Sequence, residues 1–272
     1  LEVLLQVWNR LDRDYAGRRE LERIKTDFAL NQVYGIEIHE ILARICKINL
    51  LLHHDGHTNI EGDKSCLDTE FTKERLKLGE ENFHVVVGNP PFGDIIKEGD
   101  EDQLGKSSLE DFEISAGRVQ IPSEHIIVEK SIKMLKKDGL LGLILPDGVF
   151  NNQGEQSNCP QLRNYLVKHG RILAVVSLPD YAFRKSGAQN KTSILFFKKF
   201  NYDQQISFER VYQSELTEGK TEEEAILAAL SANSYKVFMA EANYVGYSST
   251  GVLTEKNDLY RGSAGGHLSD DQ

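Results

Sequence analysis

Apolar and polar positions alternate along the chain in blocks that predict strands and helices in turn. Short apolar runs predict strands, and they fall at 33–37, 58–61, 83–87, 140–145, 172–178 and 191–197. Apolar positions at helical spacing fall at 1–30, with a break near 15–17, and at 41–52, 123–135, 162–168 and 222–230. Strands separated by helices are typical of a parallel sheet. The pattern therefore predicts an α/β, Rossmann-like fold with helices on both faces, and an antiparallel strand at 191–197 on the sheet edge.

The chain is organised around the stretch from Phe83 to Phe92. Three valines after Phe83-His84 form the apolar run expected of a parallel strand covered on both faces. Pro90 and Pro91 cannot donate to a sheet ladder, so the strand ends before them. The carboxyl end of such a strand is where ligands bind in open α/β sheets. We therefore expect a functional site at this turn.

The residues of this turn suit the transfer of a methyl group to a planar NH2 group. The side-chain carbonyl of Asn89 and the backbone carbonyl of Pro90 can both accept hydrogen bonds from that nitrogen, which stabilises the charge that develops during attack. The ring of Phe92 can stack on the face of a base and hold it in place. The plain alternative is a strand that is followed by a proline-rich turn without a chemical role.

Composition narrows the class of protein. The 272 residues carry a net charge of −10 and 40% hydrophobic residues, enough for a sizeable core. No apolar run approaches the ~20 residues that span a bilayer, and no secretory signal is visible. The three cysteines are far apart, which indicates a reducing cytoplasm rather than a disulfide framework. The acidic balance argues against a free-standing nucleic-acid binder, so any DNA contact must be local or supplied by a partner.

The turn Asn89-Pro90-Pro91-Phe92 resembles the catalytic motif of N6-adenine DNA methyltransferases. More of the chain, from about Asn31 to Asp258, resembles the modification subunit of type I restriction systems. The further segments that carry this resemblance are 35–53, the Asp138-Gly139 turn with the strand and 147–150 after it, and 244–259. The resemblance implies a site-specific enzyme that transfers a methyl group from S-adenosyl-L-methionine to N6 of a flipped-out adenine in double-stranded DNA. It also implies a separate specificity subunit and a restriction subunit as partners.

Two carboxylates are candidates for holding the cofactor. Glu37 ends the predicted strand 33–37, a position where a carboxylate can bind both hydroxyls of a ribose, and the resemblance supports this role; a glutamate that opens a helix is the plain alternative. The resemblance also implies an acid that takes the amine of the cofactor's adenine. We assign this role to Asp63 rather than Asp68, with a simple turn aspartate as the alternative.

Other candidate sites are weaker. The resemblance implies target-base and DNA contacts in the loop 179–190, so Phe183 is expected to stack and Lys191 to touch phosphate; a core aromatic and a solvated edge charge are the alternatives. The histidines within 53–57 are interpreted as a polar connection, and no metal site is predicted. The polar segment 93–122 is expected to be a functional loop or a solvated insertion.

The resemblance also predicts which part of the family's cofactor site this sequence lacks. The glycine-rich turn that binds the methionine part of the cofactor has no counterpart upstream of Glu37. We therefore expect a chain that lacks the first strand and this loop, with a catalytic domain over 1–200 and a helical or irregular extension over 201–272. Two alternatives stay open. Methylases of a glutamine amide or of an RNA guanine amine share the Asn-Pro-Pro-aromatic turn, which at Asn89–Phe92 of this chain is called the corner below. A non-catalytic subunit would dock on restriction partners without binding the cofactor.

Overall fold

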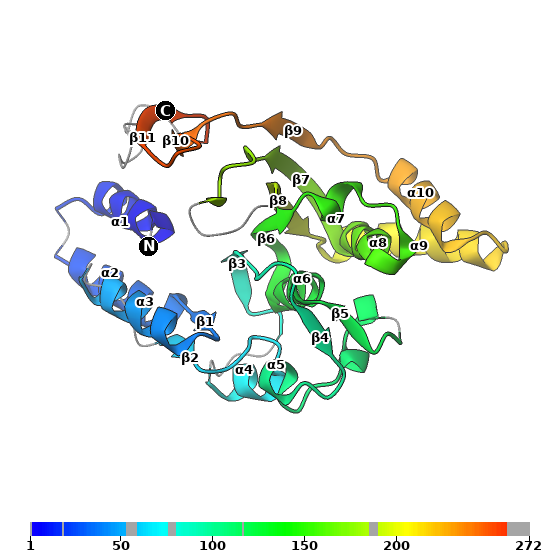
Figure 1. Ribbon diagram of the computed structural model, residues 1–272, viewed down its shortest axis with the longest axis horizontal. Helices are drawn as coiled ribbons and strands as arrows, with labels where there is room; N and C mark the ends of the chain where they lie inside the picture. Colours follow the sequence, from blue (N-terminus) through cyan, green and yellow to red (C-terminus); the bar gives the residue numbers. More distant parts are fainter. Residues whose placement is uncertain are drawn as a thin grey trace. The chain divides into compact units, whose positions relative to one another are not determined.

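The computed structural model describes residues 2–17, 19–52, 59–75, 80–115, 117–184 and 190–259 (Figure 1). These residues form two compact units. The first unit lies within Leu1–Gly79 and Gly99–Ser108, and the second lies within Glu80–Glu98 and Leu109–Gln272. None of the helices in the described ranges has the length and apolar character needed to cross a membrane.

The first unit contains a strand–helix–strand crossover. Its elements are α1 (Glu2–Asp14), α2 (Leu21–Gln32), β1 (Gly35–Glu37), α3 (Glu40–Leu52), β2 (Ile60–Gly62), α4 (Thr69–Arg75) and α5 (Glu101–Leu104). β1 and β2 are parallel, and Glu37 stands opposite Gly62. A Cβ atom at Gly62 would lie 2.7 Å from the Cβ of Ala43 in α3, so only glycine allows this close packing. The predicted break between the first two helices and the predicted strands at 33–37 and 58–61 are confirmed.

The second unit is built on a five-stranded sheet. Its strands in spatial order are β3 (Phe83–Gly88), β6 (Leu135–Pro146), β8 (Thr192–Lys199), β7 (Gly170–Ser177) and β9 (Phe238–Glu241). β3 is parallel to β6 and β9 is parallel to β7, whereas β8 is antiparallel to both of its neighbours. The α/β fold class is therefore confirmed, as a mixed sheet.

Helices and short elements complete the second unit. The α-helices are α6 (Ser123–Met134), α7 (Gly148–Asn151), α8 (Cys159–His169), α9 (Tyr202–Thr217) and α10 (Glu222–Ala232). The short strands are β4 (Ile95–Lys97), β5 (Gln120–Pro122), β10 (Val245–Tyr247) and β11 (Leu253–Asn257), and the 3₁₀ turns are η2 (Leu109–Asp111), η3 (Glu113–Ser115) and η4 (Glu155–Ser157). Leu143 of β6 and Phe197 of β8 are buried in the middle of the sheet, where the apolar runs predicted them.

Two expectations about the second unit are wrong. β3 is parallel as expected but is not covered on both faces, because its Val85 and Val87 are exposed; it also forms an edge of the described sheet, where only β6 pairs with it. β8 is antiparallel as expected but lies inside the sheet, between β6 and β7. The segment 93–122, for which a functional loop or a solvated insertion is expected, has its two ends paired as β4 and β5, and its role stays a prediction. The boundary predicted at residue 200 stays a prediction, although β9 from beyond it pairs with β7.

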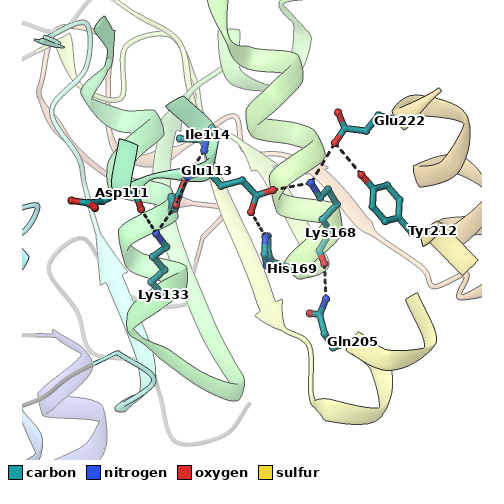
Figure 2. Close-up of polar contacts among 10 residues, drawn as sticks. Asp111, Glu113, Ile114, Lys133, Lys168, His169, Gln205, Tyr212 and Glu222 are labelled. Carbon is teal, nitrogen blue, oxygen red and sulfur yellow. Dashed lines mark hydrogen bonds and ion pairs between the residues drawn. The ribbon is translucent and has the colours of Figure 1, made fainter. Parts of the chain in front are cut away.

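A polar network ties η3 to α8 and to α10 (Figure 2). The Glu113 carboxylate accepts hydrogen bonds from Lys168 at 2.7 Å and from His169 at 3.1 Å. Lys168 also contacts Glu222 at the start of α10 at 3.3 Å. The buried carboxylate of Glu129 in α6 accepts the backbone N–H groups of Glu113 and Ile114, at 2.9 and 2.8 Å. These bonds satisfy polar groups that burial would otherwise leave unpaired.

Candidate functional site at the carboxyl edge of the sheet

The strand directions bring several candidate residues to one edge of the five-stranded sheet. β3, β6, β7 and β9 all run the same way, so the residues that follow their carboxyl ends share that edge. Asn89 follows β3, Asp147 follows β6 and the segment with Phe183 follows β7. Because β8 is antiparallel, Lys191 precedes it at the same edge. This edge of an open α/β sheet is where ligands bind.

The Asn89–Phe92 turn leaves β3 at this edge. Asn89 is exposed, Pro90 is buried and Phe92 is half-buried. Gly93 then has a φ of +82°, a left-handed conformation that favours glycine. Immediately afterwards the chain enters β4, which pairs with β5 in the antiparallel sense. The turn is therefore fixed at both of its ends by paired strands.

The first turn of α6 also holds this corner. The Ser123 hydroxyl donates to the backbone carbonyl of Pro91 at 3.2 Å, and the Ser123 backbone N–H donates to that of Asp94 at 2.8 Å. Pro122 is the N-cap of α6, and the hydroxyl of Ser123, in the first turn of the helix, is bonded to the Asn89–Phe92 turn instead. The sequence contains no sign of this contact, because 32 residues separate the two partners.

Two titratable side chains follow Ser123 in α6. Glu124 is only 8% exposed, and burial raises the pKa of its carboxyl, although hydrogen bonds from the backbone N–H groups of Glu124 and Gly93 act in the opposite direction. His125 lies deeper, and burial with the nearby charge of Arg118 lowers its pKa to about 4, so its imidazole is neutral at pH 7. Neither residue was predicted from the sequence as part of the site.

Hydrogen bonds join the end of β6 to the start of β8, at the same edge of the sheet as the corner. The Ser193 hydroxyl donates to Oδ1 of Asp147 at 2.6 Å, and the Asp147 backbone N–H donates to the carbonyl of Lys191 at 3.0 Å. These bonds fix the start of β8 and with it the position of Lys191.

The two predicted DNA contacts lie at this edge in defined surroundings. The Lys191 ammonium forms an exposed ion pair with Glu241, at 3.2 Å. Phe183 is partly buried against a small apolar cluster of Leu178, Ala182 and Ala242. Nothing in these contacts tests a role toward DNA, so both assignments stay predictions.

The two predicted cofactor carboxylates lie together in the first unit. Glu37 ends β1 opposite Gly62, and Asp63 follows Gly62 directly, with a positive φ of 77° and an exposed side chain. Oε1 of Glu37 accepts the backbone N–H of His39 at 2.8 Å, which orients the carboxylate. The alternative acid, Asp68, is buried and accepts the backbone N–H of Phe71 in α4. Because Asp68 is used in this way, the arrangement favours Asp63, whose role stays a prediction.

Within the described residues, no group of three or more histidine, cysteine, aspartate or glutamate side chains is placed to hold a metal ion. The histidines within 53–57, which were interpreted as a polar connection, lie outside the described residues.

The chain is similar to known proteins in sequence and in fold. The family described as N-6 DNA Methylase matches residues 16–255. The methylase subunit of the type I restriction enzyme MpnII from Mycoplasma pneumoniae is 27% identical over 178 residues, which make up 64% of this chain and 32% of that subunit. The corresponding subunit of EcoEI from Escherichia coli is 25% identical over 177 residues, 65% of this chain and 32% of that one. The chain therefore spans about a third of the length of these curated relatives.

The likeness extends to a solved structure. A modification subunit assigned to a type I restriction enzyme from Vibrio vulnificus superimposes with a TM-score of 0.53 at 17% identity, over 72% of this chain and 37% of that one. At this level of identity the match concerns the fold alone.

Proposed function

The chain belongs to the N-6 DNA methylase family, and we propose that its Asn89–Phe92 turn is the catalytic corner of a site-specific methyltransferase that acts on N6 of adenine in DNA. The observation that carries this proposal is the placement of the turn. It follows a parallel strand at the carboxyl edge of the sheet, and α6 holds its backbone through the 3.2 Å bond from Ser123 to Pro91. A backbone held in this way, with the exposed side chain of Asn89 next to it, suits a reaction that depends on orientation.

The residues of the corner act on the adenine amine. The target base leaves the duplex to reach them, as base-modifying enzymes require. The Asn89 side-chain carbonyl and the Pro90 backbone carbonyl accept the two N–H groups of the amine, which directs its nitrogen lone pair out of the ring plane. The half-buried Phe92 ring stacks on the base. The nitrogen would attack the methyl carbon that the cofactor supplies, so that the nitrogen–carbon bond forms as the sulfur–carbon bond breaks and the sulfur keeps the electron pair; the methylated amine then releases one proton to solvent.

S-adenosyl-L-methionine fits the chemistry of the residues at the end of β1 and β2. When bound, this cofactor supplies a methyl group that is activated by a positively charged sulfur. Glu37 would accept the ribose hydroxyls, and Asp63 would accept the adenine amine of the cofactor. The fit rests on two carboxylates at the carboxyl ends of neighbouring parallel strands, and one of them, Glu37, is already oriented by the 2.8 Å bond from the His39 backbone N–H.

DNA and partner subunits complete the proposal. Phe183 would stack on a base and Lys191 would contact a phosphate at the carboxyl edge of the sheet. A net charge of −10 gives the chain little general attraction for DNA. Sequence choice would therefore come from a separate specificity subunit, in a type I system with a restriction subunit, located in the cytoplasm with the DNA.

Methyl transfer by the intact gene product tests this function. The enzyme, with its specificity subunit, is given radiolabelled S-adenosylmethionine and genomic DNA that lacks adenine methylation, with an RNA substrate in parallel. We expect N6-methyladenine to form in DNA, Asn89→Ala to abolish it, and Asn89→Asp to retain part of it, because a carboxylate still accepts the amine hydrogen bond. Asn82→Ala, at the other end of β3, is the control. Near-normal transfer by Asn89→Ala would refute the role of the corner.

A further inference from the structure

The segment 242–258, which follows β9, packs against the part of the chain that carries Phe183. Its first residue, Ala242, donates its backbone N–H to the carbonyl of Ser177, the last residue of β7, at 2.8 Å. Ala242 also belongs to the small apolar cluster against which Phe183 is partly buried, and Val245 packs on the same cluster. The surroundings of the Phe183 ring are therefore built in part by a segment that is distant from it in the sequence.

Two tyrosine hydroxyls connect this segment with the loop after β7. The Tyr247 hydroxyl donates a hydrogen bond to the backbone carbonyl of Ala182, the residue directly before Phe183. The Tyr181 hydroxyl donates to the backbone carbonyl of Asn243 at 2.8 Å. The two tyrosine rings also meet edge to face, with their centroids 6.2 Å apart. Each segment thus contributes one hydroxyl to the contact.

The other polar contacts of residues 179–184 are local, as far as the structure describes the chain. The backbone N–H groups of Ala182 and Arg184 each donate to the carbonyl three positions earlier, at 2.9 and 3.1 Å. The Arg184 side chain pairs with Asp180, four positions earlier. Such contacts give the loop its shape but do not attach it to another element. Beyond its apolar packing, the loop is therefore attached through the two tyrosine hydroxyls.

The fold of the segment 242–258 suits the presentation of Tyr247. The pairing of β10 with β11 shifts its register between Val245 and Tyr247, and Gly246 between them has a φ of +84°. Irregularities of this kind re-aim side chains and are frequent next to functional sites. Asp258, directly after β11, accepts the backbone N–H of Asn243 through its Oδ2 atom at 2.7 Å. Tyr247 consequently stands on a hairpin whose two ends are bonded together.

We propose that Tyr181 and Tyr247 are positioning residues, which set the orientation in which Phe183 meets the target base. The bond from Tyr247 reaches the carbonyl of Ala182, so its loss frees the backbone immediately before the ring. A stacking ring contributes to methyl transfer only where it holds the base in the reactive orientation. This inference rests on the function proposed above, and it gives the segment 242–258 a part in that function.

Four variants of the intact gene product test the role of the two hydroxyls. Tyr247→Phe and Tyr181→Phe each remove one hydroxyl and keep the ring, so the apolar packing stays. Tyr235→Phe is the control, because the Tyr235 hydroxyl also bonds to the backbone of β7 but at its other end, where it accepts the N–H of Ile172 at 3.2 Å. Phe183→Leu removes the aromatic ring and keeps an apolar side chain on the cluster.

Two measurements separate positioning from stability. The first is hydrogen–deuterium exchange over 178–184, and the second is the division of methyl transfer between kcat and the KM for DNA. We expect Tyr247→Phe and Tyr181→Phe to exchange these amides at least about threefold faster. The same variants should lower kcat about 3- to 10-fold, the loss that one neutral hydrogen bond accounts for, with the KM changed less than about twofold. Tyr235→Phe should change neither quantity.

A double-mutant cycle tests whether Tyr247 acts through Phe183. The Tyr247→Phe change is made in the wild type and in Phe183→Leu, and kcat is compared within each pair. In the Phe183→Leu background it should lower kcat by less than about twofold, because the ring that the hydroxyl positions is already gone. Equal losses in the two backgrounds would show that Tyr247 acts independently of Phe183 and would overturn the proposal.

The outcomes decide the two proposals separately. Wild-type exchange over 178–184 in both tyrosine variants overturns the positioning role, and so does an equal loss of kcat in Tyr235→Phe. If the wild-type protein transfers no methyl group, the proposed function fails, and the exchange measurement still determines whether the hydroxyls hold the loop. If Asn89→Ala abolishes transfer while both tyrosine variants keep wild-type kcat, the function stands and only the positioning role is refuted.

Discussion

The hydroxyl of Ser123 donates a hydrogen bond to the backbone carbonyl of Pro91 across 3.2 Å, although 32 positions separate the two residues in the sequence. The backbone N–H of Ser123 reaches Asp94 as well, at 2.8 Å. One residue at the start of α6 therefore holds the chain on both sides of Phe92 and Gly93. The orientation of the corner consequently depends on a helix that follows it by thirty residues, as well as on the strand that leads into it.

Replacing Ser123 by alanine should weaken the corner. We expect Ser123→Ala to lower the free energy of unfolding by about 1 kcal/mol and kcat by about fivefold, because a neutral hydrogen bond contributes roughly that amount. Urea denaturation and methyl transfer measure the two effects. Ser131→Ala is the control, since Ser131 is also buried in α6 but lies near its other end. Equal losses of kcat in the two variants would show that the bond to Pro91 has no special role.

Gly93 should matter for activity beyond its effect on stability. Gly93 and Gly219 have φ angles of +82° and +84°, and neither would bring a Cβ atom within 4 Å of other atoms. Both Gly93→Ala and Gly219→Ala should therefore lower the free energy of unfolding by about 1–2 kcal/mol through backbone strain. Only Gly93→Ala should also reduce methyl transfer at a matched folded fraction. Equal activity of the two variants would exclude a role for this turn.

The Glu37 carboxylate should be needed for cofactor binding. We expect Glu37→Gln to weaken the binding of S-adenosylmethionine to the intact gene product roughly 10- to 100-fold, because a hydrogen bond to a charged acceptor contributes about 1.5–3 kcal/mol. Isothermal titration calorimetry measures this affinity. Glu40→Gln, which loses an exposed pairing with Arg44 in α3, is the control and should bind as the wild type does. Unchanged binding by Glu37→Gln would refute the assignment.

Lys191 should contribute to DNA affinity without choosing the sequence. Lys191→Ala is expected to weaken binding to all DNA sequences alike and to reduce the slope of log K against log salt by about 1, because one phosphate contact is lost. Fluorescence anisotropy at several salt concentrations gives this slope. Lys198→Ala, near the other end of β8 and paired with Asp138, is the control. The same slope in wild type and Lys191→Ala would mean that Lys191 serves only its ion pair with Glu241.

The polar network around Glu113, drawn in Figure 2, should make the stability of the folded protein depend on pH in the acid range. The hydrogen bond from His169, together with Lys168, lowers the pKa of Glu113 to about 2 despite partial burial. A carboxyl whose pKa is lower in the folded protein favours folding above its unfolded pKa of about 4.3, and this contribution is lost as the pH falls toward 2. Between about pH 5 and pH 2 the urea midpoint should fall less steeply in Glu113→Gln than in the wild type.

Glu155→Gln provides the comparison for that experiment. Glu155 is exposed in η4, so its replacement should leave the pH dependence of the urea midpoint as it is in the wild type. Parallel curves for wild type and Glu113→Gln would show that the contacts of Glu113 with His169 and Lys168 do not affect stability.

The sequence by itself determined the local elements and the chemical type of the corner. Apolar runs marked β6 and β7, because a strand buried within a sheet requires uninterrupted apolar residues. The prolines after Asn89 fixed the end of β3, because proline cannot donate to a ladder. Glu37 was proposed because it stands at the end of a strand, and Asp63 through the resemblance; β1 and β2, whose carboxyl ends carry them, are parallel neighbours.

Only the tertiary structure decided which residues support the corner. Pairing order depends on contacts between distant segments, so the sequence could not show that β8 lies inside the sheet or that β3 is at its edge. The same holds for Ser123, whose contact with Pro91 no local pattern predicts. Its role arises because β4 and β5 pair and bring the start of α6 against Pro91, and no local propensity encodes that approach.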